Sequence, residues 1–335
     1  MFKKILLTGV ILLLLAAAVG LWARQRLMTP YQGFAENEVF VELPAGTGVA
    51  GIASRLAAAG VIPDPLSFRL MVRLTGADRK LQAGEYRFAG QTSPTAVMER
   101  LVAGDVYTHA VTFPEGLTIA EMGEIFAKSG LGTADSFVAA ASDVKLVSAY
   151  DTRARSLEGY LFPATYALGR RAGAEGAVRA MIGGFDRAFD NDLRAEAAAR
   201  GLTTREVLTL ASLVEKETAV PEERPIVSAV LQNRLKIGMP LQCDPTVIYA
   251  LMRAHRWNGN IRKADLQIDS PYNTYTVRGL PPGPIASPGR ASLEAAVRPA
   301  EVPYLYFVSR NDGTHVFAAS LAEHNRNVAK FQGRH

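Results

Sequence analysis

The chain has 335 residues, of which 48% are hydrophobic and 21% charged, with a formal net charge of +5. This composition excludes an intrinsically disordered chain, and the length allows two folded domains. Its one cysteine, Cys243, excludes an intramolecular disulfide framework, and we expect it to be a small buried residue. The basic residues are scattered and the five histidines lack ligand spacing, so the sequence indicates no nucleic-acid partner, no metal and no cofactor.

The first feature along the chain is an uncharged apolar run over residues 5–23, bounded on both sides by basic residues. As a helix it would be about 28 Å long, close to the hydrocarbon thickness of a bilayer. We therefore predict a single-pass transmembrane anchor, with residues 1–4 in the cytoplasm and the rest of the chain exported. A cleaved signal peptide is the alternative, because Ala16–Ala18 are small, but the run continues to Trp22, which suits a membrane interface.

A small α/β unit is predicted next, between Val39 and about Asp105. Alternating apolar residues indicate strands at 39–43 and 84–88, and helical periodicity indicates a helix over 49–62. A further helix is predicted from Pro94, with Ser93 as its N-cap.

An internal similarity relates residues 41–61 to residues 111–131. The two segments share identical residues at corresponding positions, among them Pro44 with Pro114 and Gly46 with Gly116. The similarity predicts two related strand–turn–helix units, which we expect to be small modules packed beside one larger domain.

From Gly173 onward the pattern is mostly helical. Thr203 and Glu206 have capping-box spacing and predict a helix from about 204 to 219. A second helix is predicted over about 222–237. Asp244, followed by a proline, is predicted to be the N-cap of a third helix.

The C-terminal part begins with a proline- and glycine-rich segment over residues 270–289. Its aromatic and amide residues indicate a functional loop rather than a disordered one. The triplet Asn311-Asp312-Gly313 lies between two strand-like runs and predicts a β-hairpin, and a last helix is predicted over about 321–331.

The segment most indicative of chemistry is Glu215-Lys216-Glu217, at the end of the helix predicted from Thr203. The two glutamates lie about 200° apart on a helix, so only one of them can face a given site. Periodicity places Lys216 in solvent and the glutamates at similar angles on either side of the apolar face. An ordinary structural interpretation is that both border the core and pair with cations such as Arg224 or Arg234.

Polar and aromatic motifs follow this helix within about seventy residues. They include "NRL", "QCDPT" and "YNTYT", which together supply amides, hydroxyls and rings near a helix-borne carboxylate. Side chains of these kinds bind sugars and could hold a sugar polymer next to one acid. They favour a functional role for one of the two glutamates.

The motifs "ASLVEKETAVPEERP", "YNTYTVRGLPPGPIASPG", "YLYFV" and "HVFAASLAEHN" closely resemble the YceG/MltG family of membrane-anchored endolytic murein transglycosylases. The resemblance covers nearly the whole chain; Cys243 departs from it, since threonine is familiar there. It implies an α+β fold with a LysM-like α/β subdomain at 38–107. The catalytic domain would be 108–335, mainly helical and lysozyme-like, with a β-hairpin.

The resemblance also distinguishes the two glutamates. In similar enzymes the acid is a helix glutamate followed by a small hydroxyl residue, which Glu217-Thr218 matches and Glu215-Lys216 does not. Glu217 would act as general acid and then as base. It would cleave the bond between N-acetylmuramic acid and N-acetylglucosamine without water, leaving 1,6-anhydromuramyl ends.

The remaining site residues are assigned by their chemistry. Asp244 also fits its helix N-cap, and this role is favoured, while Asn233 and Arg234 fit the bracing of a helix pair equally well. The residues assigned to substrate binding are Thr218, Gln242, Asp244, Tyr272, Asn273 and Tyr275, and those assigned supporting roles are Glu215, Asn233, Arg234 and His315.

Two other functions stay open at this point. A hydrolytic muramidase would use Asp244 as its second carboxylate, and a non-catalytic scaffold would only bind glycan. The implied location is the bacterial inner membrane, with the catalytic domain outside the cytoplasm. The implied partners are peptidoglycan strands, the membrane, and peptidoglycan synthases and division proteins.

Overall fold

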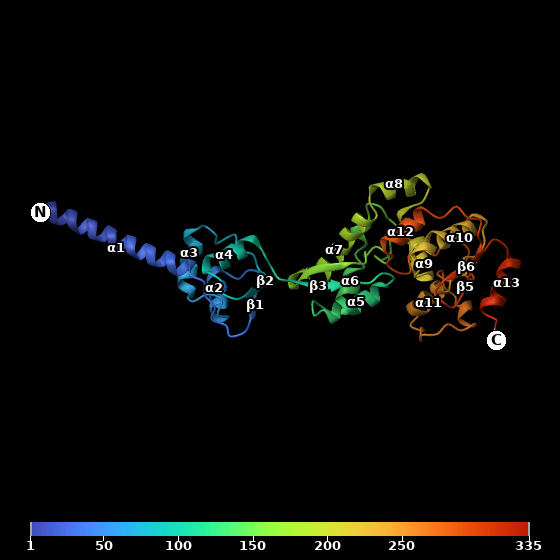
Figure 1. Cartoon of the computed structure of the whole chain (residues 1–335), viewed down its shortest axis with the longest axis horizontal. Helices are drawn as coiled ribbons and strands as arrows, with labels where there is room; N and C mark the ends of the chain where they lie inside the picture. Colours follow the sequence, from blue (N-terminus) through green and yellow to red (C-terminus); the bar gives the residue numbers. More distant parts are fainter. Residues whose placement is uncertain (1, 334–335) are drawn as a thin grey trace. The chain divides into compact units, whose positions relative to one another are not determined.

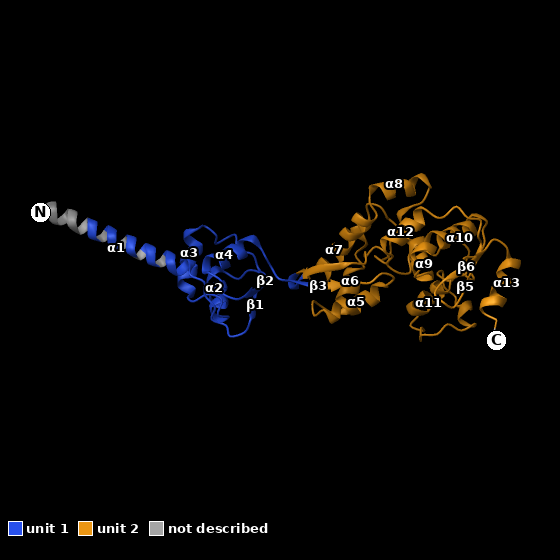
Figure 2. Ribbon diagram, viewed as in Figure 1, with its two compact units in different colours: residues 1–109, 169–171 blue, residues 110–168, 172–335 orange. Residues whose placement is uncertain are grey.

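The computed structural model describes residues 2–333 and combines helices with small sheets, which confirms the expected mixture of α and β structure (Figure 1). The chain divides into two compact units (Figure 2). Unit 1 comprises residues 1–109 and 169–171, and unit 2 comprises residues 110–168 and 172–335.

The helices and strands follow in chain order. The α-helices are α1 (Phe2–Met28), α2 (Val49–Ala58), α3 (Pro65–Leu74), α4 (Pro94–Ala103), α5 (Ile119–Lys128), α6 (Ala134–Ala140), α7 (Gly173–Ala188), α8 (Asn191–Ala199), α9 (Thr204–Glu217), α10 (Arg224–Lys236), α11 (Asp244–Arg253), α12 (Arg290–Val297) and α13 (Leu321–Phe331). The strands are β1 (Glu38–Leu43), β2 (Gly84–Ala89), β3 (Thr108–Thr112), β4 (Thr165–Gly169), β5 (Tyr306–Ser309) and β6 (His315–Ala318).

The predicted anchor, residues 5–23, falls within α1. The predicted cytoplasmic tail begins at Met1, which lies outside the described residues. In the part of the chain that the structure describes, no helix is both long enough and apolar enough to cross a membrane. Membrane anchoring stays a prediction.

Unit 1 packs helices against the antiparallel pair β1 and β2, in which Val41 lies opposite Tyr86. Both predicted strands are confirmed, and α4 begins at Pro94 with the Ser93 hydroxyl accepting a hydrogen bond from Ala96 N–H. The helix predicted over 49–62 ends early, at Ala58. It ends there because Gly60 adopts a positive φ of 69°, which terminates a helix at little steric cost.

One helix of unit 1, α3, was not predicted. The Asp64 side chain caps it by accepting a hydrogen bond from Ser67 N–H at 2.7 Å, and Pro65 follows as its first residue. Asp64-Pro65 is the same type of start signal as Ser93-Pro94, so the sequence did contain the information.

The internal similarity corresponds to two strand–turn–helix units, β1–α2 and β3–α5. Gly46 and Gly116 hold the same place in the two turns and have the same φ of +76°. The expectation that both copies pack beside a larger domain is wrong for the second copy. Phe113, Met122 and Phe126 of that copy are part of the main hydrophobic core of unit 2.

The core of unit 2 is organised around α9, against which α8, α10, α11 and α12 pack (Figure 1). All eight residues from Val207 to Val214 are buried, so this helix is covered on every side. The predicted capping box is present: Thr203 Oγ1 accepts from Glu206 N–H, and the Glu206 carboxylate accepts from Thr203 N–H. The helix ends at Glu217, two residues before the predicted end, because Thr218 is extended.

Three further predictions are confirmed, the first of them with shifted boundaries. The helix predicted over 222–237 is α10, preceded by a 3₁₀ turn over Pro221–Glu223. The predicted hairpin is β5 and β6, in which Phe307 lies opposite Phe317. The last predicted helix is α13.

The segment 270–289 contains no helix or strand, as predicted, yet it is tied to its surroundings. Ser287 exchanges backbone hydrogen bonds with the turn at Gly116 and Leu117, each at 2.8 Å. Ile285 N–H donates to the Ser212 hydroxyl of α9 at 3.1 Å. These bonds hold the proline-rich loop against the central helix.

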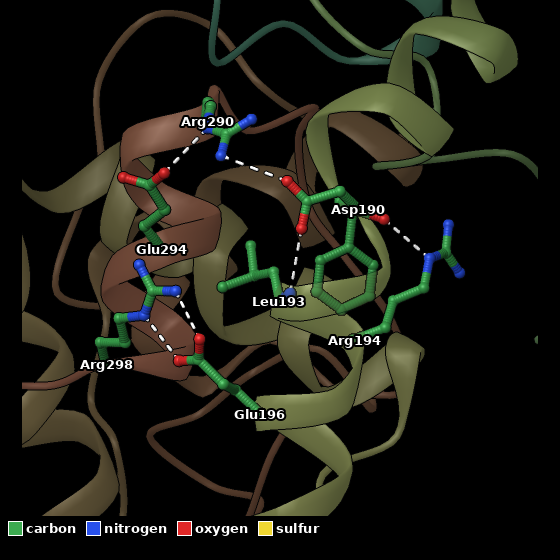
Figure 3. Close-up of polar contacts among 8 residues, drawn as sticks. Asp190, Leu193, Arg194, Glu196, Arg290, Glu294 and Arg298 are labelled. Atoms are coloured by element: carbon green, nitrogen blue, oxygen red, sulfur yellow. Dashed lines mark hydrogen bonds and ion pairs between the residues drawn. The ribbon is translucent and has the colours of Figure 1, made fainter.

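Charged residues join α8 to α12 on the surface of unit 2 (Figure 3). Arg298 forms two hydrogen bonds with the Glu196 carboxylate, at 2.5 and 2.6 Å. Arg290 lies between Glu294 and Asp190, at 2.8 and 3.4 Å. All of these side chains are well exposed, so water and salt weaken the pairs.

The close approach of the proline-rich loop to Gly159 is testable. Gly159 has a φ of +82°, and an added Cβ would lie 2.5 Å from Pro284 Cβ. We expect Gly159→Ala to lower the free energy of unfolding by about 1–3 kcal/mol more than the matched control Gly201→Ala. Gly201 has a similar φ of +74° but open space around it.

Chemical denaturation of both variants measures this difference. Equal losses of stability for the two variants would contradict the close contact.

Candidate active site

Glu217 is the last residue of α9, and the residue as a whole has an intermediate exposure. Burial raises the pKa of this carboxyl to about 7, and the nearby Asp244 carboxylate acts in the same direction. The nearby Cys243 thiol and the Arg234 guanidinium oppose the shift. The C-terminal end of a helix also disfavours an anion. A substantial fraction of Glu217 therefore holds its proton at neutral pH.

Asp244 and Tyr275 lie beside Glu217 as a hydrogen-bonded pair. Tyr275 Oη donates to Asp244 Oδ1 at 2.6 Å, and charges on Asp244 and Glu217 both raise the pKa of the Tyr275 phenol, after burial itself. The prediction that Asp244 is the N-cap of α11 is wrong: Cys243 holds that position, and Asp244 is the first helical residue. Its carboxylate is engaged by Tyr275 instead.

Gln242 precedes Cys243 and is exposed. Its φ of +52° is unusual for a residue other than glycine, and its N–H donates to Thr274 O at 3.1 Å. The backbone bond fixes this residue, while its side-chain amide faces solvent. Of the predicted binding residues, Asp244 and Tyr275 thus present polar groups near Glu217, and Gln242 is exposed two residues before Asp244.

Two other predicted binding residues are buried. Asn273 is fully buried; its Nδ2 donates to the carbonyls of Leu266 and Ile268, and its Oδ1 accepts from Tyr275 N–H. Thr218 is 4% exposed. The structure gives both residues a structural role, which corrects their assignment to substrate binding.

The Thr218 hydroxyl donates to a buried carboxylate, Glu223, at 3.1 Å. Glu223 also accepts hydrogen bonds from His315, from the backbone N–H at 2.8 Å and with the ring Nδ1 at 2.7 Å. Burial raises the pKa of Glu223, but the bonds from His315 and Thr218 outweigh it, and the net pKa is lowered. Glu223 is therefore an anion that fixes the chain just after Glu217.

Asn233 and Arg234 brace the end of α10 against the chain before β5. Asn233 Nδ2 donates to the carbonyls of Val302 and Tyr304, at 2.9 and 3.0 Å. Arg234 is 8% exposed and its Nε donates to Leu305 O at 2.6 Å. These bonds favour the bracing role that the sequence left open, and His315 is likewise occupied by Glu223.

Glu215 has a side chain only 7% exposed, and both of its oxygens are engaged. Oε1 lies 3.4 Å from Arg224 Nη2, and Oε2 accepts from Gly289 N–H at 3.0 Å, next to the first residue of α12. Lys216 between the glutamates is exposed, and its Nζ donates to Gly116 O. Glu215 thus ties the end of α9 to the starts of α10 and α12.

Tyr272, the sixth predicted binding residue, faces a different part of unit 2. Its ring packs edge-on against Tyr249, with centroids 4.9 Å apart, and Arg253 lies 5.3 Å from its centre. Both neighbours line a separate cavity together with Tyr272. Within residues 2–333, no group of three or more His, Cys, Asp or Glu side chains is arranged to hold a metal ion.

Two residues of the site were missed by the sequence analysis. Cys243 was expected only to be buried, which it is, yet its thiol also lies near Glu217 and acts on the pKa of that carboxyl. The available signal was its place between Gln242 and Asp244, where the family resemblance implies a hydroxyl residue. Glu223 gave no signal, because its partner His315 is 92 residues away in sequence.

The comparisons with known proteins agree with one another. The YceG-like family model matches residues 41–330. An endolytic murein transglycosylase of Bacillus subtilis is 33% identical over 91% of this chain and 88% of its own length. One of Streptococcus pneumoniae is 30% identical over 98% of this chain, which spans 65% of that relative.

A solved structure is also similar. The crystal structure of a yceG-like protein from Listeria monocytogenes is 30% identical, with a TM-score of 0.60, over 88% of this chain and all of that one. A half-buried carboxyl with a raised pKa lies at the end of a central helix, near Asp244 and Tyr275, and this makes Glu217 the candidate for acid–base chemistry. The chain belongs to the YceG-like family.

The burial of Glu217 predicts a pH-dependent stability difference. The folded-state pKa, about 7, lies above the ordinary 4.5, so the neutral carboxyl favours folding, and that contribution is lost as the pH rises from about 4.5 through 7. At pH 8 we expect Glu217→Gln to have a higher free energy of unfolding than wild type, by on the order of 1–3 kcal/mol. Near pH 4 the difference disappears.

Urea denaturation between pH 4 and 8 provides the measurement. Glu215→Gln is the matched control and should be destabilised, since it weakens the contact with Arg224. A pH-independent difference between wild type and Glu217→Gln would contradict the raised pKa.

Proposed function

We propose that this protein is a lytic transglycosylase that cleaves peptidoglycan glycan strands within the strand, between N-acetylmuramic acid and N-acetylglucosamine. The observation that carries the proposal is the raised pKa of Glu217 at the end of α9. The names of the curated relatives, endolytic murein transglycosylases, support the reaction and the substrate class.

In the proposed mechanism one carboxyl group acts twice. The protonated Glu217 donates its proton to the glycosidic oxygen as the bond to the muramyl C1 breaks. The resulting carboxylate then takes the proton of the muramyl C6 hydroxyl while that oxygen bonds to C1. Glu217 is protonated again at the end of the reaction, as it was at the start. No water is consumed, and the new end is a 1,6-anhydro sugar.

The surrounding residues have defined parts in this scheme. A pKa near the working pH suits a group that must give and then accept a proton. Gln242 and Tyr275 would bind sugar hydroxyls, and Asp244, held by Tyr275, would stabilise positive charge developing at C1. Glu223 would act indirectly, by holding Thr218 and so the end of α9.

Hydrolysis by a muramidase mechanism is the second candidate, and one observation favours it. Asp244 is a second carboxylate beside Glu217, and inverting or retaining glycosidases use two. The products separate the two candidates, because hydrolysis adds one water to each cleaved bond.

The proposal extends to location. Residues 5–23 would anchor the chain in the inner membrane, with residues 1–4 in the cytoplasm and unit 2 outside it. Residues 38–107 would form a LysM-like, glycan-binding subdomain, and 108–335 a lysozyme-like catalytic domain. Peptidoglycan synthases and division proteins are the proposed partners at this membrane.

Glu217→Gln tests the proposal directly. The amide keeps the shape of the side chain but cannot cycle a proton, so we expect glycan cleavage to fall by at least about 10³-fold. Glu215→Gln, in the same helix, should retain activity within about tenfold, because Glu215 contacts only protein groups. Mass spectrometry of wild-type products should show 1,6-anhydro ends that lack one water.

Two results would count against this proposal. If Glu217→Gln cleaves glycan at the wild-type rate, Glu217 is not the general acid. Products that carry the extra water would identify hydrolysis instead.

A further inference from the structure

Unit 2 contains a cavity of about 520 Å³ that Glu217 does not line. Its wall comes from the start of α5, the segment 151–160, Arg205 in the first turn of α9, the end of α11, and the proline-rich loop at Tyr272. The volume is in the usual range for small-ligand pockets, about 300–1,000 Å³.

The charges in the wall favour an anion. Three arginines line the cavity: Arg155, Arg205 and Arg253. Of its two carboxyl groups, Asp151 already accepts from Arg205 Nη2 at 2.7 Å and from the Tyr160 hydroxyl. The contact with Asp151 neutralises the charge of Arg205, which leaves Arg155 and Arg253 to bind a ligand.

Glu158, the second carboxyl group, is 9% exposed and is not part of the proposed mechanism. It accepts hydrogen bonds from Ile119 N–H at 3.0 Å and from Tyr249 Oη at 3.2 Å. Burial raises its pKa to about 7 against these bonds, so near neutral pH it carries only part of a charge. Its presence does not cancel the excess of arginines.

One donor of Arg205 is unused. Nη1 donates to Pro282 O at 3.2 Å and Nη2 to Asp151, whereas the buried Nε has no hydrogen-bond partner among residues 2–333. A buried N–H of a charged group without an acceptor costs free energy. This atom has almost no accessible surface, so the guanidinium groups that can meet a ligand are those of Arg155 and Arg253, which are exposed. A carboxylate is the acceptor whose geometry best fits a guanidinium edge.

The rest of the wall consists of small side chains of mixed polarity. Alanine side chains at 120, 141 and 154 line it, together with Ser142, Ser156 and Ser270 and the rings of Tyr249 and Tyr272. Such a surface accommodates methyl-sized side chains and offers hydroxyl groups to peptide N–H and C=O groups.

We infer that this cavity binds a short acidic peptide with small side chains. The inference rests on the proposed function, because the glycan strands of peptidoglycan carry peptides of this chemistry. Arg205 and Glu217 are twelve residues apart in α9, about 18 Å along the helix. An extended peptide of about five residues is as long as that separation.

Calorimetric titration of the full-length chain in detergent with the tripeptide L-Ala-γ-D-Glu-L-Lys tests the cavity without relying on cleavage. Arg253→Gln is the informative variant, since Arg253 lines the cavity and is exposed at the end of α11. We expect saturable binding to wild type, weakened about tenfold or more in Arg253→Gln and unchanged in Arg256→Gln. Arg256 is an exposed arginine three residues further on that does not line the cavity.

No binding to wild type, or equal binding by wild type and Arg253→Gln, would overturn the inference.

Cleavage rates give the second test. We expect a higher kcat/KM for strands that carry their peptides than for strands stripped of them, and loss of that preference in Arg253→Gln. Equal rates on both strands would overturn the peptide site while leaving the proposed function intact. If neither strand is cleaved, the proposed function fails, and the titration still decides whether the cavity binds the peptide.

Discussion

The burial of a single carboxyl group at the end of α9 is the constraint on which the site depends. Because α9 is covered by four other helices, its last residue emerges where the protein is still dense enough to penalise a charge. The pKa of Glu217 rises for that reason. The same packing limits how far the end of α9 can move, because the Thr218 hydroxyl is bonded to Glu223. The proline-rich loop is also held against α9, by the bond from Ile285 N–H to the Ser212 hydroxyl. Core packing and acid–base chemistry therefore have one structural origin.

The two glutamates of the segment differ in what they contact rather than in how deeply they lie. Glu215 gives both oxygens to protein groups, the Arg224 guanidinium and the Gly289 N–H. Glu217 has the Cys243 thiol and the Asp244 carboxylate as neighbours. The fixed partners of Glu215 give it a structural role, whereas Glu217, whose pKa is raised by burial, can exchange a proton near neutral pH. Unit 2 thus uses neighbouring residues of one helix for two separate tasks.

Local signals explain which parts of the structure were predictable from the sequence. The capping box of Thr203 and Glu206 and the Asn-Asp-Gly hairpin depend on residues within a few positions, and both are present. Asp244 failed as an N-cap because Tyr275, 31 residues later, engages its carboxylate. Helical periodicity could not decide whether Glu215 or Glu217 faces the site, because it supposes a single apolar face. In the structure α9 is buried on all sides. Glu223 and the cavity at Glu158 depend on contacts between distant segments, which no short pattern encodes.

The central claim is that Glu217 is protonated to a large extent at neutral pH, and a direct titration tests it most closely. Carbon-13 NMR of the glutamate side-chain carboxyl groups, compared between wild type and Glu217→Gln, isolates this residue from Glu158, whose pKa is also raised to about 7. The account predicts that the resonance lost in the variant titrates with a pKa near 7. A lost resonance that titrates near 4.5, the ordinary value for glutamate, would contradict it.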